Sequence, residues 1–357
     1  MAEVKPFRAV RYGEPAGPLE TLVAPPYDVI SPPEREELRA RNPHNVVHLT
    51  LTDDEAEAGR LWRDWRDGGV LEDEREPGYW WLSQDYVGPD GVARTREGLV
   101  AALRAEPYDK RVVLPHELTH RGPKEGRLRL LREARAQLEP LFFLYEGGPP
   151  AQRPEREPDA ELEDIRLWRL PPDGIAEAFA DRRLLIADGH HRYETALAYH
   201  EETATEESAY VLAVLVSLDD PGLTIFATHR VFEHVDGDGG SPYDDVDAAL
   251  RDLEQQPPDR AHGVLYRREA IEMLRGRPGQ LDVELVDALR AEGVSYTPSA
   301  DDAIESVVRG DAEGALFVRP TRVQDVYARA QEGLVMPQKT TYFYPKLVSG
   351  LLFLALD

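Results

Sequence analysis

The chain has 357 residues, of which 41% are hydrophobic, so it is long enough for two globular domains with cores of their own. Its 67 acidic side chains outnumber the 42 basic ones, and the formal net charge of −25 argues against a nucleic-acid or anionic-membrane partner. The absence of cysteine excludes disulfides, thiolate nucleophiles and cysteine-based metal sites. No apolar run reaches the roughly 20 residues of a membrane-spanning helix, and nothing at the N-terminus resembles a signal peptide, so we expect a cytoplasmic protein.

The positive charge comes almost entirely from arginine. An acid-rich, lysine-poor surface is typical of a halophilic, salt-loving host. Lysines that remain under such a bias are candidates for positions that need a compact ammonium group, although chance survival explains any single one equally well. The five lysines are Lys5, Lys110, Lys124, Lys339 and Lys346, and the last three lie in unusual local sequence.

A proline-rich turn dominates the first fifty residues. Two prolines precede Tyr27 and Asp28 and would present both side chains rigidly, which makes Asp28 a candidate acid or base. An ordinary turn aspartate is the alternative. Ser31 is expected to cap a helix that opens with two further prolines. Alternating residues over 45–50 predict a strand.

A loop dense in ionisable side chains follows a predicted strand near residue 113. His116 and Glu117 could serve as acid or base, and Lys124 stands at the entrance of a predicted helix over 125–138, where it could help bind an anion. The alternative is a solvent-exposed polar loop without a role.

The stretch from 184 to 197 predicts a buried strand, a sharp turn at a glycine, and a helix. Free backbone N–H groups and the positive end of the helix dipole favour an anion at this turn. The arginine and two imidazoles add donors, while the aspartate could orient a hydroxyl, accept its proton or hold Mg²⁺. A plain helix cap with a salt bridge is the alternative. The residues concerned are Asp188, Gly189, His190, His191 and Arg192.

Two later segments are expected to join this site. His229 and Arg230 lie in a β segment over 223–232, which is predicted to form a hairpin with 210–218, and could complete a phosphate pocket. The hydroxyl- and aromatic-rich tail around Lys339 is expected to fold back and close the site.

We expect an α/β protein with a mixed α+β sheet. The predicted regions are an N-terminal α/β region (1–145), a core with the aspartate–glycine turn (160–235), a small α/β lobe (236–334) and a returning C-terminal segment (335–357). The small lobe is expected to include a helix over 281–292.

Several stretches closely resemble the DUF1015 family along nearly the whole chain. They are Pro25–Ile30, Pro115–Glu117 with Pro123–Lys124, Asp188–Ala196, Thr228–Arg230 and Met336–Lys346. The Asp-Gly-His-His-Arg turn is also similar to that of free serine kinases with the ParB/sulfiredoxin fold, which implies a ParB/sulfiredoxin-like core with an additional α/β lobe.

The second resemblance implies that residues 189–192 bind the transferring phosphoryl group and that Asp188 helps to activate a serine hydroxyl. The glutamate base of those kinases has no clear counterpart, and Asp28 or Glu117 could replace it. His191 could take part in the acid–base chemistry as well as in phosphate binding.

The first functional hypothesis is therefore a phosphotransferase of serine metabolism that forms O-phosphoserine with Mg²⁺ and either pyrophosphate or ADP/ATP. The absence of a Walker-type loop favours a compact donor held by histidine, arginine and lysine. Alternatives are a phosphoserine phosphatase and a non-catalytic sensor of a phosphorylated metabolite. The expected partner is a small molecule, neither nucleic acid nor membrane, and the oligomeric state stays open.

Overall fold

The structure is a computed structural model that describes residues 1–117, 122–237, 239–337 and 339–357; the side chains of residues 122–124 lie outside this description. The chain divides into two compact units, Met1–Leu223 with Pro345–Asp357, and Thr224–Tyr344. The region predicted at 1–145 belongs to the first unit, whereas the region predicted at 160–235 lies in the first unit up to Leu223 and in the second from Thr224. The lobe predicted over 236–334 falls inside the second.

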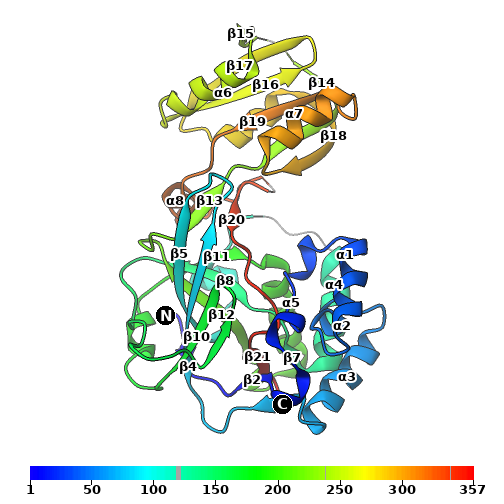
Figure 1. The fold of residues 1–357 in the computed structure, drawn as a ribbon. Helices are drawn as coiled ribbons and strands as arrows, with labels where there is room; N and C mark the ends of the chain where they lie inside the picture. Colours follow the sequence, from blue (N-terminus) through cyan, green and yellow to red (C-terminus); the bar gives the residue numbers. More distant parts are fainter. Residues whose placement is uncertain (118–121, 238, 338) are drawn as a thin grey trace. The chain divides into compact units, whose positions relative to one another are not determined.

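A mixed nine-stranded sheet forms the centre of the first unit (Figure 1). β11 pairs in parallel with β6, and β12 in parallel with β8, whereas the other pairs are antiparallel, which confirms the expected mixed α/β class. The strand order is β6 (Val113–Leu114), β11 (Leu184–Asp188), β8 (Leu141–Tyr145), β12 (Tyr210–Ser217), β5 (Ala93–Arg104), β4 (Tyr79–Val87), β10 (Ile165–Leu170) and β9 (Ala160–Leu162), and β1 (Val4–Lys5) pairs with β5.

Local sequence explains why these segments are strands. β8 and β12 are continuous apolar runs whose residues are all buried, as expected for strands covered on both faces. β4 and β5 form an antiparallel hairpin, and Gly91 in its turn has a φ of +73°, which favours glycine.

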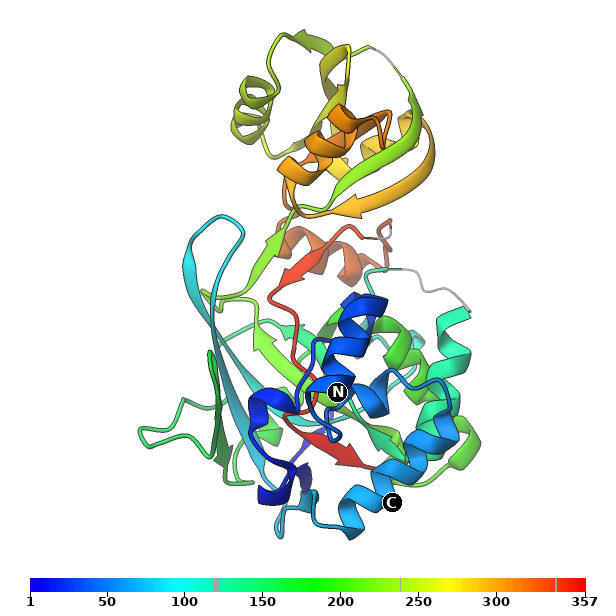
Figure 2. The ribbon, with the colours of Figure 1, turned by 45° about the vertical axis from the view of Figure 1, so that its right-hand side comes forward.

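The α-helices of this unit lie together on one side of the sheet (Figures 1 and 2). Ser31 caps the first of them, as the sequence predicted, and Glu34 completes a capping box with it. The helices are α1 (Pro32–Arg41), α2 (Val47–Thr50), α3 (Glu55–Asp67), α4 (Gly122–Ala134) and α5 (His190–Thr203). The unit also contains a four-stranded sheet in the order β3 (Leu71–Asp73), β2 (Ala9–Tyr12), β21 (Phe353–Ala355) and β7 (Ala136–Gln137). Its short 3-10 helices are η1 (Glu14–Ala16), η2 (Leu19–Thr21), η3 (Tyr27–Val29), η4 (Tyr108–Lys110), η5 (Ala176–Phe179) and η6 (Glu207–Ala209).

Two predictions in this helical layer were wrong. Residues 45–50 form no strand but the buried helix α2, because the side chain of Asn45 accepts a hydrogen bond from the backbone N–H of Val47 and starts a helical turn. The helix predicted over 125–138 ends at Ala134, where Arg135 adopts a φ of +49° and the chain enters β7.

The C-terminal segment covers one face of the large sheet. In Figure 1 it runs between the sheet and the helices towards β21. Leu347, Val348, Leu351 and Leu352 line a mainly apolar cavity together with sheet residues such as Val214. This path brings Lys346, just upstream, to the same sheet.

The second unit contains a six-stranded antiparallel sheet in the order β15 (Ser241–Tyr243), β17 (Ala270–Pro278), β16 (Arg260–Arg267), β19 (Gly314–Val318), β14 (His229–Asp236) and β18 (Arg290–Thr297). The helices α6 (Val246–Gln255) and α7 (Ala300–Arg309) pack on it (Figure 2), and their apolar faces share one core cluster. The 3-10 helix η7 (Asp282–Ala288) belongs to a second cluster. The unit also has α8 (Val323–Glu332) and a pair formed by β13 (Thr224–Phe226) and β20 (Tyr342–Tyr344).

Two further predictions were wrong in this region. The helix predicted over 281–292 is a 3-10 helix only as far as Ala288, and the chain then enters β18. The segments 210–218 and 223–232 form no hairpin, because β12 pairs with β5 and β8 while β13 pairs with β20.

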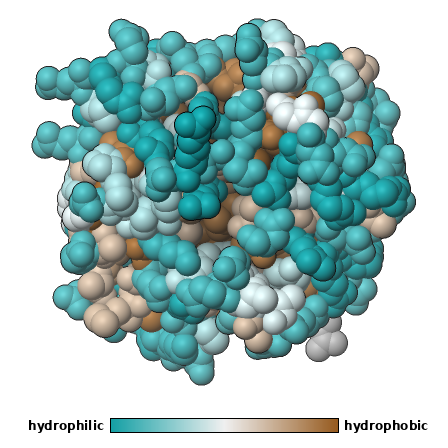
Figure 3. Space-filling view, turned by 90° about the horizontal axis from the view of Figure 1, so that it is seen from below, coloured by the Kyte–Doolittle hydropathy of each residue, from teal (hydrophilic) through white to brown (hydrophobic). Residues whose placement is uncertain are grey.

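The face seen in Figure 3 carries mostly hydrophilic side chains, with apolar ones in separate small patches. Among the described residues, no helix combines the length and the apolar character needed to cross a membrane.

Candidate functional site

The candidate site is built around the turn between β11 and α5. Gly189 occupies this turn with a φ of +99°, and a Cβ atom there would lie 3.2 Å from a terminal nitrogen of Arg192 and from Cγ of Leu141. Both the backbone conformation and the available space therefore require glycine. Within the described ranges, no side chain forms a capping hydrogen bond at the start of α5.

Asp188, the last residue of β11, is held between two cations. One carboxylate oxygen accepts a hydrogen bond from Nζ of Lys346, and the other accepts one from Arg192 at 2.9 Å. Burial acts to raise the pKa of Asp188, but the charges of Lys346 and Arg192 outweigh it and lower that pKa to about 2. Asp188 is therefore ionised at neutral pH.

The two cations stay charged for the same reason. Burial would lower the pKa of Lys346, yet the adjacent Asp188 carboxylate raises it above its ordinary value. The charges of Glu139 and Asp188 likewise outweigh burial at Arg192, whose pKa is raised. Arg192 also donates to the carbonyl oxygen of Pro140 at 2.7 Å, which fixes its orientation.

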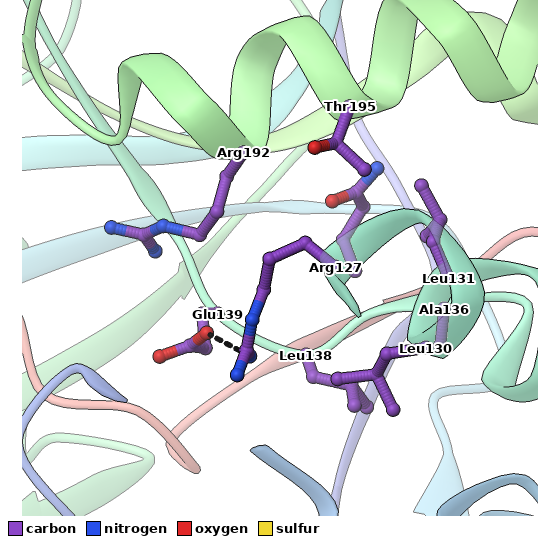
Figure 4. Close-up of a pocket in the computed structure, with 9 residues that line it drawn as sticks. Arg127, Leu130, Leu131, Ala136, Leu138, Glu139, Arg192 and Thr195 are labelled. Carbon is purple, nitrogen blue, oxygen red and sulfur yellow. Dashed lines mark ion pairs between the residues drawn. The ribbon is translucent and has the colours of Figure 1, made fainter. Parts of the chain in front are cut away.

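A second acid–base pair lies beside Arg192. Glu139 is buried, and one of its oxygens accepts hydrogen bonds from the Tyr27 backbone at 3.1 Å and from the Ser349 hydroxyl at 3.2 Å. The other oxygen lies 3.6 Å from the guanidinium of Arg127 (Figure 4). Glu139 thus connects the proline-rich turn, the C-terminal segment and helix α4.

The turn at Tyr27 and Asp28 reaches this cluster as well. The Arg127 guanidinium stacks over the Tyr27 ring at 3.8 Å. Burial raises the pKa of Tyr27, partly offset by the charges of Arg127 and Arg192. Asp28 is exposed, and its negative charge helps to raise the pKa values of Arg192 and Lys346, which places it close to both.

Two buried histidines form another wall. The rings of His116 and His190 pack edge to face at 4.6 Å, and the backbone N–H of His116 donates to Nε2 of His190 at 3.3 Å. Nδ1 of His116 lies 2.6 Å from the carbonyl oxygen of Ile186, so this nitrogen carries a proton. Burial lowers the pKa of His116 to about 4 and that of His190 well below its usual value, so both rings are neutral at pH 7.

The remaining predicted residues are distributed as follows. Glu117 lies 3.7 Å from Nε2 of His116, and His191 is partly buried in the first turn of α5. The side chain of Lys124 lies outside the described part of the chain. His229, Arg230 and Lys339 belong to the second unit, where Arg230 donates to the backbone oxygen of Lys339 at 3.3 Å and the N–H of Val318 donates to His229 at 3.4 Å.

Three residues that contact the central cluster were not among the predicted site residues: Lys346, Glu139 and Arg127. Two sequence signals pointed to Lys346: the scarcity of lysine, and the resemblance of Met336–Lys346 to the DUF1015 family. Glu139 and Arg127 are an ordinary acid and base in a chain rich in both, so only the fold identifies them.

The residues at the turn between β11 and α5 can bind an anion and position a hydroxyl. The cations Arg192 and Lys346 lie beside the start of α5, where no side chain of the described residues caps the backbone N–H groups. The residues at this turn fit a resident magnesium ion poorly, since both oxygens of Asp188 already contact cations. Within the described ranges, no group of three histidine, aspartate or glutamate side chains could hold a metal ion.

Several solved structures are similar to this chain. A free serine kinase in complex with AMP is 15% identical, with a TM-score of 0.39 over 71% of this chain and 92% of that one. A conserved hypothetical protein from Pyrococcus furiosus is 15% identical, with a TM-score of 0.37 over 71% and 95% of the two chains. C-terminally truncated SbnI from Staphylococcus aureus is 10% identical, with a TM-score of 0.37 over 70% and 85%. The ParB/sulfiredoxin assignment of the core stays a prediction.

No curated protein sequence matches this chain. A family model described as "Protein of unknown function (DUF1015)" matches residues 4–288, which is most of the chain and includes the turn after β11. The residues that carried the resemblance lie largely within this range. The chain is therefore a member of the DUF1015 family.

Proposed function

We propose that this protein transfers a phosphoryl group to a small hydroxy amino acid, with free L-serine as the first candidate. The observation that carries the proposal is the ionised Asp188, held between Arg192 and Lys346 at the open N-terminal turn of α5. Phosphoryl transfer depends mainly on positioning and on neutralising charge, and this turn offers the groups for both.

In this proposal the phosphoryl group binds at the first turn of α5. The backbone N–H groups of residues 189–191 and the Arg192 fork contact its oxygens. Lys346 adds a point charge next to Asp188. Neutral His190 accepts a bond at Nε2, so its proton resides on Nδ1, which can donate to an oxygen. His191 is proposed as a further donor.

Asp188 is better suited to orienting the acceptor hydroxyl than to removing its proton. A carboxylate with a pKa of about 2 is a weak proton acceptor at neutral pH, so Asp188 would hold the acceptor hydroxyl and the Lys346 ammonium in place. Asp28 and Glu117 remain the candidates for the base. Asp28 is exposed beside the two cations, and Glu117 lies next to His116.

The donor is proposed to be pyrophosphate or a nucleotide. Because Asp188 already contacts two cations, Mg²⁺ would enter bound to the phosphate oxygens of the donor, which it prefers together with water. Lys124, His229, Arg230 and Lys339 stay predictions as phosphate-binding residues, and none of the interactions above depends on them.

The test is direct. Purified protein at high salt is incubated with L-serine, Mg²⁺ and, in separate reactions, pyrophosphate, ADP or ATP, and O-phosphoserine is measured by mass spectrometry. We expect product with at least one donor. Absence of product with all three, in protein that binds phosphate, would refute the kinase. Incubation of O-phosphoserine with Mg²⁺ alone, followed by phosphate release, tests the phosphatase alternative.

A non-catalytic sensor of a phosphorylated metabolite is the second candidate. The observation in its favour is that the central carboxylate has a lowered pKa and bonds two cations, as in a binding site that lacks a base. If the protein is a sensor, the variant Asp28→Asn binds O-phosphoserine with the same affinity as the wild type, and neither protein forms O-phosphoserine.

A further inference from the structure

A small cavity lies next to the candidate site in the first unit (Figure 4). Its volume is about 40 Å³, room for about three water-sized atoms. Arg192 both lines the cavity and bonds Asp188, so the cavity adjoins the proposed phosphoryl site. The apolar lining residues are Leu130, Leu131, Ala136 and Leu138. The polar and charged lining residues are Arg127, Gln137, Glu139, Arg192 and Thr195.

Two hydrogen-bond donors in this lining have no acceptor among the described residues. Nε2 of Gln137 is fully buried without a partner, and the Gln137 side chain belongs to a residue only 6% exposed. A terminal nitrogen of Arg127 is also buried without a hydrogen bond, since its nearest carboxylate oxygen, on Glu139, lies 3.6 Å away. Leaving such groups unpaired costs about 1–3 kcal/mol each, so an acceptor group that reached these two side chains from the cavity would be stabilised by them.

The size and charge of the cavity limit the choice of acceptor. A carboxylate has three non-hydrogen atoms and a single negative charge, which matches both the volume and the two donors. A phosphate dianion is larger, and the Glu139 carboxylate in the same wall would repel its second charge more strongly. The leucine wall suits the carbon atoms that follow a carboxylate.

We propose that this cavity binds the carboxylate of the acceptor substrate, with Gln137 and Arg127 as the two donors and the leucine side chains against its carbon chain. That the bound carboxylate belongs to the acceptor substrate rests on the proposed function. That the cavity binds a small carboxylate does not depend on the proposed function. The acceptor class is therefore a hydroxy acid, which includes L-serine, and not a simple alcohol.

Equilibrium binding tests the site without turnover. Isothermal titration of the whole protein with L-serine and 3-hydroxypropanoate is expected to show binding, while L-serinamide and 1,3-propanediol, which lack the carboxylate, bind at least tenfold more weakly. Inorganic phosphate is titrated as a competitor. Equal affinity for L-serine and L-serinamide, or binding of phosphate without either acid, would overturn the proposal.

The variant Gln137→Leu removes one donor and keeps the volume similar. We expect a ten- to hundredfold loss of affinity for 3-hydroxypropanoate, because hydrogen bonds to charged groups contribute about 1.5–3 kcal/mol. The free energy of unfolding should not fall, since the variant removes a buried amide donor that has no partner. Gln256→Leu, in the second unit, is the matched control and should bind normally.

The two proposals fail separately. If no donor yields O-phosphoserine but the carboxylates bind and need Gln137, the kinase is wrong and the carboxylate site stands. If O-phosphoserine forms and Gln137→Leu leaves the KM for L-serine unchanged, the kinase stands and the carboxylate site is wrong. A raised KM with little change in kcat is the expected result.

Discussion

The Asp188 carboxylate accepts a hydrogen bond from Lys346, a residue 158 positions further along the chain. This contact joins the end of a central strand to the C-terminal segment that crosses the same sheet. It also holds the ammonium group beside the first turn of α5, where the anion site is proposed. The predictions below test this arrangement.

Removing one partner of this pair should destabilise the fold. In Lys346→Met the mostly buried Asp188 keeps Arg192 as its one ionic partner among the described residues, and we expect a loss of about 3 kcal/mol in the free energy of unfolding. Denaturant titration measures it. The double variant Asp188→Asn with Lys346→Met should lose less than the sum of the two single losses, and strict additivity would contradict a direct interaction.

Acid should weaken the protein through the two buried histidines. The pKa of His116 is about 4 in the folded state and near 6.5 when unfolded, so the unfolded state binds more protons between these values. The stabilising effect of the neutral ring is complete above pH 6.5 and is lost as the pH falls towards 4. From pH 7 to 5 this residue alone should cost about 2 kcal/mol.

Denaturant titrations at several pH values check this slope. His116→Asn should flatten the slope between pH 7 and 5, because the titrating ring is gone. The matched control is His234→Asn, which replaces an exposed histidine and should keep the wild-type profile. An unchanged slope in His116→Asn would show that the ring is not buried in its neutral form.

The shape of the Arg192 side chain should matter as much as its charge. Arg192→Lys keeps a positive charge but cannot contact Pro140 and Asp188 at once, so we expect at least a hundredfold loss of phosphotransfer. The exposed Arg129, which pairs with Glu55, provides the control Arg129→Lys, with activity expected to be unchanged. Equal activity of the two variants would remove Arg192 from the site.

The glycine at the turn should be irreplaceable for both stability and activity. Gly189→Ala forces an L-residue to a φ of +99° and brings Cβ within 3.2 Å of Arg192, so we expect about 2 kcal/mol of destabilisation and a large loss of activity. Gly310→Ala introduces similar backbone strain at a φ of +85°, after α7 in the second unit. It should lose stability to a similar degree and keep its activity.

Much of the fold could be predicted from local patterns. The helix start at Ser31 and the strand–turn–helix at Gly189 depend on neighbouring residues, and each formed as expected. Failures occurred where local patterns are ambiguous. The short segment 45–50, which mixes apolar and polar residues, suits a buried helix as well as a strand, and the residues after 288 pair with β14, a distant strand.

The sequence alone determined the chemistry at the turn after β11, because Asp188, Gly189 and Arg192 are close neighbours in the chain and a single helical turn brings them together. Tertiary structure alone decided what those side chains do. Lys346 and Glu139 reach the turn only because the C-terminal segment crosses the sheet and the chain leaves β7 beside α5. Their charges set the pKa values of Asp188 and Arg192, and burial, which no local pattern measures, makes both histidines neutral.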